Sequence, residues 1–158
     1  MNEILEKFQT FFNETSYPIR IMWNMKDFDS WNEIKKKVEM TTLPEDLYFY
    51  EREIWWIRMG LNIGSEQDGK GYLSLRPVLI LKKHNVQCCL CISLTTINKD
   101  NPYHFTFWCK DDYVSAIISQ IKLIDSKRLV RKIGIVFHSE FDEIKKVIAH
   151  VNLGQPLP

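Results

Sequence analysis

Residues 52–81 read REIWWIRMGLNIGSEQDGKGYLSLRPVLIL, and this stretch decides the fold. Aromatic and β-branched residues dominate its two ends, which is typical of β-strands. The glycines and polar residues between the ends indicate a long loop. We therefore expect two neighbouring strands whose connection gathers an acid, an amide and an arginine.

The chain continues this β pattern after residue 81. Further strands are predicted at 86–94, 103–109, 114–124 and 131–137. A last helix is predicted over 139–153, with Ser139 as its N-cap. Its apolar residues recur at helical spacing and are Phe141, Ile144, Val147, Ile148 and Val151. Five or six short strands closed by one helix predict a mainly β (α+β) fold, a small, partly open barrel.

The sequence before this β region has apolar residues at helical spacing. Residues 2–12 place apolar side chains on one stripe of a helix, and a second helix is expected to start with Asp29 or Ser30 as N-cap. We expect residues 1–45 to form an N-terminal helical extension of a barrel domain at 46–158. Because the stripes must be buried, the extension is expected to pack on the barrel.

Composition narrows the class of protein. The 158 residues are 45% hydrophobic and 26% charged, which is ordinary for a globular protein. A formal net charge of +1 argues against a uniformly basic surface that coats DNA. The sequence has no apolar run long enough for a membrane span and no basic region of a signal peptide, so we expect a cytoplasmic protein.

The cysteines and histidines do not form a metal-binding pattern. Cys89 and Cys91 point to one face of a strand and Cys88 to the other, and no CxxC pair is present. We interpret the cysteines as small buried hydrophobic residues. His104 is expected to be a half-buried strand residue, with a proton shuttle as the alternative. We predict no metal and no cofactor.

Five ordered motifs resemble the MazF/PemK family of toxins from toxin–antitoxin pairs. They are REIWWIRMGLNIGSEQDGKG, RPVLIL, ISLTTINK, SQIKLIDSKRL and the C-terminal helix, spread over residues 51–153. The resemblance implies an SH3-like barrel of the CcdB/MazF type that forms a homodimer. It also implies a cognate antitoxin, DNA binding together with that antitoxin, and metal-independent cleavage of single-stranded RNA, usually messenger RNA. The ribose 2′-hydroxyl would attack, leaving a 2′,3′-cyclic phosphate and a 5′-hydroxyl.

The resemblance also implies the site residues. The family's catalytic arginine falls on Arg76, its threonine on Thr95, and the glutamate of its GSEQ loop on Glu66. Arg76 can hold phosphate oxygens as they gain charge. Glu66 could act as a general base, but we favour a role in anchoring the loop. The candidate RNA-binding residues are Ser65, Gln67, Lys70, Tyr72, Thr96, Lys99, Gln120 and Lys122.

Two departures from the family pattern leave an alternative open. The spacer DGKGYLSL before Arg76 is longer than usual, and Ile117 and Ser119 replace an arginine and an acid that some relatives carry. The alternative is a non-enzymatic, CcdB-like toxin or binding module on the same barrel. The extension could border the groove and narrow substrate choice, or replace part of an antitoxin.

Overall fold

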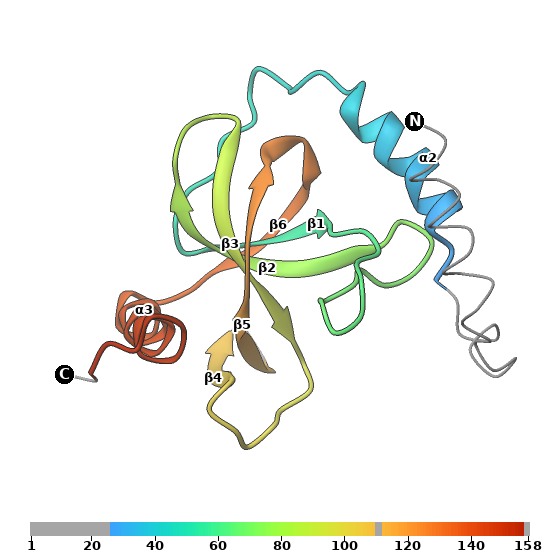
Figure 1. Ribbon diagram of the computed structural model, residues 1–158. Helices are drawn as coiled ribbons and strands as arrows, with labels where there is room; N and C mark the ends of the chain where they lie inside the picture. Colours follow the sequence, from blue (N-terminus) through green and yellow to red (C-terminus); the bar gives the residue numbers. More distant parts are fainter. Residues whose placement is uncertain (1–25, 110–111, 157–158) are drawn as a thin grey trace, which may run out of the picture.

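The computed structural model describes residues 26–109 and 112–156, which form an open, curled sheet flanked by two helices (Figure 1). The six strands are antiparallel and lie in the order β4-β5-β3-β2-β1-β6. Their bounds are β1 Glu53–Arg58, β2 Leu75–Lys83, β3 Cys88–Thr95, β4 His104–Cys109, β5 Asp112–Asp125 and β6 Leu129–Ile135. The sheet does not close, so the prediction of a mainly β, partly open barrel with flanking helices is confirmed.

The longest strand, β5, gives the sheet its curl. Its 14 residues pair with β4 over Asp112–Ile117 and with β3 along most of its length. The pairing with β3 is interrupted between Ile92 and Leu94, where the register shifts. Such irregularities bend a strand and redirect side chains, and this one lies beside Gln120.

Both faces of the central strands are buried, which explains their nearly continuous apolar runs. Along β2, Leu79 and Leu81 join one hydrophobic cluster, while Val78 and Ile80 join the other. Successive strand residues point to opposite faces, so a strand covered on both sides needs apolar residues throughout. Phe49, just before β1, is fully buried in the second cluster.

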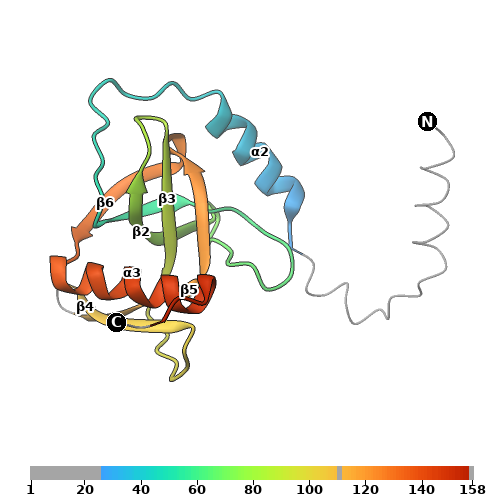
Figure 2. The same ribbon diagram turned by 60° about the vertical axis from the view of Figure 1, so that its left-hand side comes forward.

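The helix α3 (His138–Leu153) covers the first cluster through Phe141 and Ile144, and Figure 2 shows it lying across the sheet. The expected cap was wrong. The helix begins at His138, so Ser139 lies inside its first turn, and the N-cap residue Phe137 makes no side-chain capping bond. Gly154 ends the helix in a left-handed conformation, with φ 66°, that glycine adopts without strain.

The helix α2 (Phe28–Glu39) is the described part of the predicted extension, and it lies on the side of the sheet away from α3 (Figures 1 and 2). Its N-cap is Asp27 rather than Asp29 or Ser30, because the Asp27 carboxylate accepts the backbone N–H of Ser30 at 2.9 Å. Trp31 is buried against the barrel, so the predicted packing is confirmed for this helix. The helix expected at 2–12 lies outside the described residues.

Cys89 and Cys91 are fully buried, as the sequence predicts, whereas Cys88 and Cys109 are only partly buried. Burial raises the pKa of the Cys89 thiol to about 11. Trp108 is 44% exposed and packs edge-on against Tyr113. Within the described part of the chain, no helix is long and apolar enough to cross a membrane.

Candidate active site

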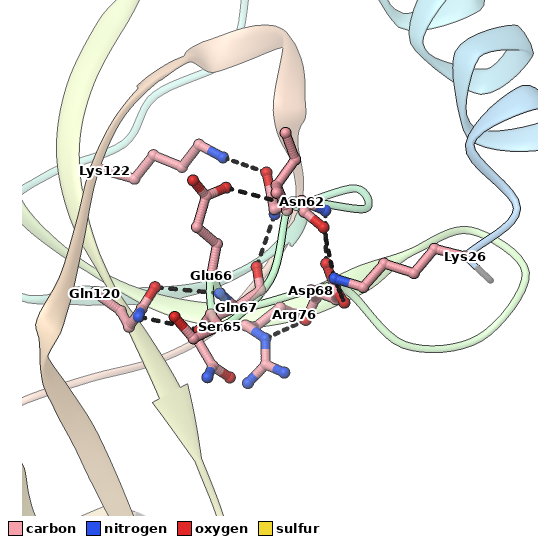
Figure 3. Close-up of polar contacts among 10 residues, drawn as sticks. Lys26, Asn62, Ser65, Glu66, Gln67, Asp68, Arg76, Gln120 and Lys122 are labelled. Carbon is pink, nitrogen blue, oxygen red and sulfur yellow. Dashed lines mark hydrogen bonds and ion pairs between the residues drawn. The ribbon is translucent and has the colours of Figure 1, made fainter. Parts of the chain in front are cut away.

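The loop between β1 and β2 is held by side chains from other parts of the chain (Figure 3). Gln120 on β5 accepts the Gln67 backbone N–H at 3.1 Å, and Lys122 donates to the Asn62 side chain at 2.8 Å. The Asn62 side chain in turn donates to the Gln67 carbonyl at 2.7 Å. The GSEQ segment is therefore fixed onto β5 by hydrogen bonds that span more than fifty residues of sequence.

The unusually long spacer folds into a compact turn. Lys70 and Leu75 pair across this turn, with N–H to carbonyl distances of 2.7 and 3.0 Å. Gly69 fits tightly, since a Cβ atom there would lie 1.8 Å from the Ser74 carbonyl oxygen. The insertion therefore brings the GSEQ segment back to β2 instead of extending it away from the sheet.

Arg76, the second residue of β2, is only 8% exposed. Its Nε donates to the Asp68 carbonyl, and its Nη1 donates to the Leu94 carbonyl at 3.2 Å. Burial lowers the pKa of the guanidinium, and the Asp68 carboxylate opposes that shift. Arginine remains protonated under such conditions, so Arg76 is a fixed positive charge at the start of β2.

Thr95, the last residue of β3, lies beside Arg76. Val78 is paired with Ser93, and the same register continued by two residues brings Arg76 opposite Thr95. Residues directly opposite each other in an antiparallel pair share a face of the sheet. The Thr95 hydroxyl accepts the Ile97 backbone N–H at 3.1 Å, which leaves its own proton free to be donated elsewhere.

Arg76 and Thr95 both line a groove of about 670 Å³, which we call the Arg76 groove. Its walls come from β1, β2, β3, β6 and the inserted turn. The lining residues are Trp56, Lys70, Gly71, Leu75, Arg76, Pro77, Leu94, Thr95, Thr96, Val130 and Arg131. An apolar groove with a few convergent polar groups is the usual form of a ligand site.

Glu66 does not lie in this groove. It lines a second cavity of about 320 Å³, which we call the loop pocket, together with Asn62, Gln67, Gln120 and Lys122. Its carboxylate accepts the Ile63 backbone N–H at 3.3 Å. Burial lowers the pKa of the Lys122 ammonium, with a further contribution from Arg128, while Glu66 raises it. The contacts of Glu66 are thus those of a residue that holds the loop.

The structure divides the other candidate residues between these two sites. Lys70 and Thr96 line the Arg76 groove. Gln67, Gln120 and Lys122 line the loop pocket, and the Ser65 carbonyl accepts from Gln120 at 3.4 Å. Tyr72 and Lys99 are exposed and line neither cavity.

Several residues of the site were not among the predicted ones. Asn62 and Asp68 flank the GSEQ segment and make much of its hydrogen bonding, and their polar side chains beside glycines were a usable signal. Trp56 and Arg131 pair across β1 and β6 and line the Arg76 groove. Only the strand order reveals that β6 borders this groove.

Within residues 26–109 and 112–156, no three His, Cys, Asp or Glu side chains gather closely enough to hold a metal ion. His104 is half-buried, as predicted, and contacts the Asn101 side chain at 2.9 Å. Burial lowers the pKa of His104, and the positive charge of Lys99 lowers it further.

Comparison with known proteins identifies related folds. Residues 50–151 match the family model described as "PemK-like, MazF-like toxin of type II toxin-antitoxin system". A search of curated proteins by sequence finds no significant match.

Solved structures share the fold at low sequence identity. MazF (Form-I) from Deinococcus radiodurans is 18% identical with a TM-score of 0.59, over 70% of this chain and 100% of that one. An endoribonuclease in complex with its cognate antitoxin from a Mycobacterial species is also 18% identical, with a TM-score of 0.53 and the same coverage. An endoribonuclease from a Mycobacterial species is 20% identical, with a TM-score of 0.51, over 72% of this chain and 100% of that one.

Proposed function

Because this chain belongs to the PemK-like, MazF-like toxins of type II toxin–antitoxin systems, we propose that it is an endoribonuclease that cleaves single-stranded RNA. The observation that carries the proposal is the presence of Arg76 and Thr95 on the walls of one groove. The groove combines a buried guanidinium, a hydroxyl and apolar walls. These are the groups that a phosphodiester and its flanking bases require.

In the proposed reaction the ribose 2′-oxygen attacks its own adjacent phosphorus. A bond forms between the 2′-oxygen and phosphorus, and the bond between phosphorus and the 5′-oxygen breaks. The products are a 2′,3′-cyclic phosphate and a 5′-hydroxyl, and the proton of the 2′-hydroxyl passes to solvent. Arg76 binds the non-bridging oxygens, whose negative charge grows in the transition state.

In this scheme Thr95 serves the leaving group. Its hydroxyl can donate to the departing 5′-oxygen while its oxygen keeps the Ile97 N–H, and solvent restores the proton. No residue of the loop pocket takes part in this scheme directly. Glu66 and Gln120 hold the loop that carries Lys70 to the groove.

The test is an incubation of the purified full-length protein with single-stranded RNA, once with EDTA and once with Mg²⁺. We expect equal cleavage in both, with cyclic-phosphate and 5′-hydroxyl ends identified by enzymatic end-labelling. If the folded protein cuts no RNA, the proposal is wrong. Cleavage that requires Mg²⁺, or that leaves 5′-phosphates, would support an endoribonuclease but contradict the proposed attack by the 2′-hydroxyl.

One observation favours a second candidate function. Ile117 is buried opposite His104, and Ser119 lines the loop pocket, so the arginine and acid of some relatives have no charged counterpart at these two positions. A non-enzymatic toxin that binds a topoisomerase subunit would need neither the arginine nor the acid at these positions. Stable binding to such a subunit without RNA turnover would support this alternative.

The proposed partners follow from the same family. We expect a homodimer in the cytoplasm and a cognate antitoxin that covers the Arg76 groove, and DNA binding by the two proteins together. Sedimentation equilibrium of the isolated protein tests the first of these expectations.

A further inference from the structure

Lys26 lies outside the segment that matches the family, yet its side chain reaches the loop of the site (Figure 3). We propose that Lys26 is a positioning residue for Arg76 and acts through Asp68. This inference rests on the proposed function, in which Arg76 binds the scissile phosphate. It makes residues of the N-terminal extension part of the active-site architecture.

The first link joins Lys26 to Asp68. The Lys26 ammonium lies 2.7 Å from one carboxylate oxygen of Asp68, and it also donates to the Asn62 carbonyl. The other carboxylate oxygen accepts the Asn62 backbone N–H at 2.6 Å. The two charged side chains are only 27% and 28% exposed, so the pair is partly shielded from water and salt.

The second link joins Asp68 to Arg76. The Asp68 carbonyl accepts from Arg76 Nε, and this carbonyl belongs to the same planar peptide unit as the Gly69 N–H. The Gly69 N–H donates to the Gly60 carbonyl at 2.7 Å. The peptide plane is therefore fixed from one side by Gly60, while its Asp68 end is held by Lys26.

The third link keeps Lys26 in place. Asp27 caps α2 directly after Lys26, and Trp31 packs on Gly60, where a Cβ atom would lie 2.2 Å from the indole ring. The guanidinium carbon of Arg128 lies 5.8 Å from the centroid of the Trp31 ring, and its Nη1 donates a hydrogen bond to the Arg58 carbonyl. The first turn of α2 is thus docked on Gly60, near the start of the loop.

These contacts determine the orientation of the Arg76 guanidinium plane. In the described structure its hydrogen bonds to the Asp68 and Leu94 carbonyls use two of the five guanidinium N–H groups. The remaining three are available to phosphate oxygens, in a plane set by the two carbonyls. If the Asp68 carbonyl loosens, the plane can rotate, and a small misplacement of a catalytic group costs up to about a hundredfold in rate.

The experiment replaces Lys26 by Met, an unbranched side chain one atom shorter than lysine that carries no charge. We expect the single-turnover rate at saturating RNA to fall by about tenfold, with KM changed less than about threefold. Lys26→Arg should restore most of the rate. Lys36→Met is the matched control, because Lys36 is on α2 and pairs only with the exposed Glu33 among the described residues.

Two further measurements distinguish a positioning role from general destabilisation. In the Asp68→Asn background, Lys26→Met should have little additional effect, since the two residues act on one path. The NMR signal of the Arg76 Nε–H should shift and exchange faster with water in Lys26→Met, and not in Lys36→Met.

Each outcome is decisive. An unchanged Nε–H signal overturns the inference whether or not the protein cleaves RNA. A changed signal with an unchanged cleavage rate also overturns the positioning role. If the protein cleaves no RNA, the proposed function fails separately, and the NMR result still decides whether Lys26 restrains Arg76.

Discussion

The Arg76 groove and the loop pocket both take lining residues from the β1–β2 loop and from β3, yet their chemistry differs. The groove, about 670 Å³, has walls such as Trp56, Pro77 and Val130, with a few polar groups among them. The loop pocket, about 320 Å³, is lined mainly by polar side chains that bond to one another or to the loop backbone. Polar groups that satisfy each other hold a structure rigid, whereas Arg76 and Thr95 have donor groups that their hydrogen bonds to the backbone do not use.

This difference separates the residues that we propose for the reaction from those that hold the loop. Arg76 and Thr95 lie in the groove, while Glu66, Gln67 and Gln120 lie in the pocket. We therefore expect substitutions in the groove to affect cleavage more than stability. Substitutions in the pocket should show the opposite balance.

The largest effect is expected for Arg76→Lys. Lysine keeps the positive charge but loses the planar fork, so cleavage should fall by about 10²–10³. Single-turnover cleavage measures the loss, and urea denaturation measures the cost in stability, expected to be about 1–3 kcal/mol because the Asp68 and Leu94 carbonyls lose their donor. A lysine variant as active as the parent would remove Arg76 from the reaction.

Thr95→Val comes next. Valine keeps the shape of threonine and removes the hydroxyl, so we expect cleavage to fall by about 10² through loss of the proton donor. Thr95→Ser, which keeps the hydroxyl, is the matched control and should remain within about tenfold of the parent. Equal rates for the valine and serine variants would show that the hydroxyl has no chemical role.

Gln120→Ala tests the loop pocket. The loss of the acceptor for the Gln67 N–H should cost about 1 kcal/mol of unfolding free energy, measured by urea denaturation, and should slow cleavage only several-fold. Gln87→Ala is the control, because Gln87 is exposed in the turn before β3 and its described hydrogen bonds use the backbone. A loss of cleavage as large as that of Arg76→Lys would abolish the distinction between the two cavities.

The smallest effect is expected for Glu66→Gln. The amide oxygen of glutamine can still accept the Ile63 N–H, so the cleavage rate should stay within about threefold of the parent. A general base would behave differently, since its removal typically costs about 10²–10⁴. The comparison of single-turnover rates at neutral pH distinguishes the two roles.

Much of the fold was predictable because the sequences of β1 and β2 have a clear strand pattern. The apolar runs around Trp55 and Leu79 are long and bounded by glycine and polar residues. The ends of the helices were less predictable. The sequence pattern indicated Asp29 or Ser30 as the N-cap of α2, whereas the Asp27 carboxylate accepts the Ser30 N–H and caps the helix. At α3 the sequence offered Ser139 as the N-cap, while in the structure the N-cap is Phe137 and the helix begins at His138.

The sequence by itself determined the strand content, the order of the motifs and the family, because these depend on local residue pattern. Only the tertiary structure decided that Glu66 and Arg76 line different cavities, and that Lys26 reaches Asp68 across 42 positions of the chain. The physical reason is that strand register and a long-range ion pair depend on how distant segments pack. No local pattern of residues records that packing.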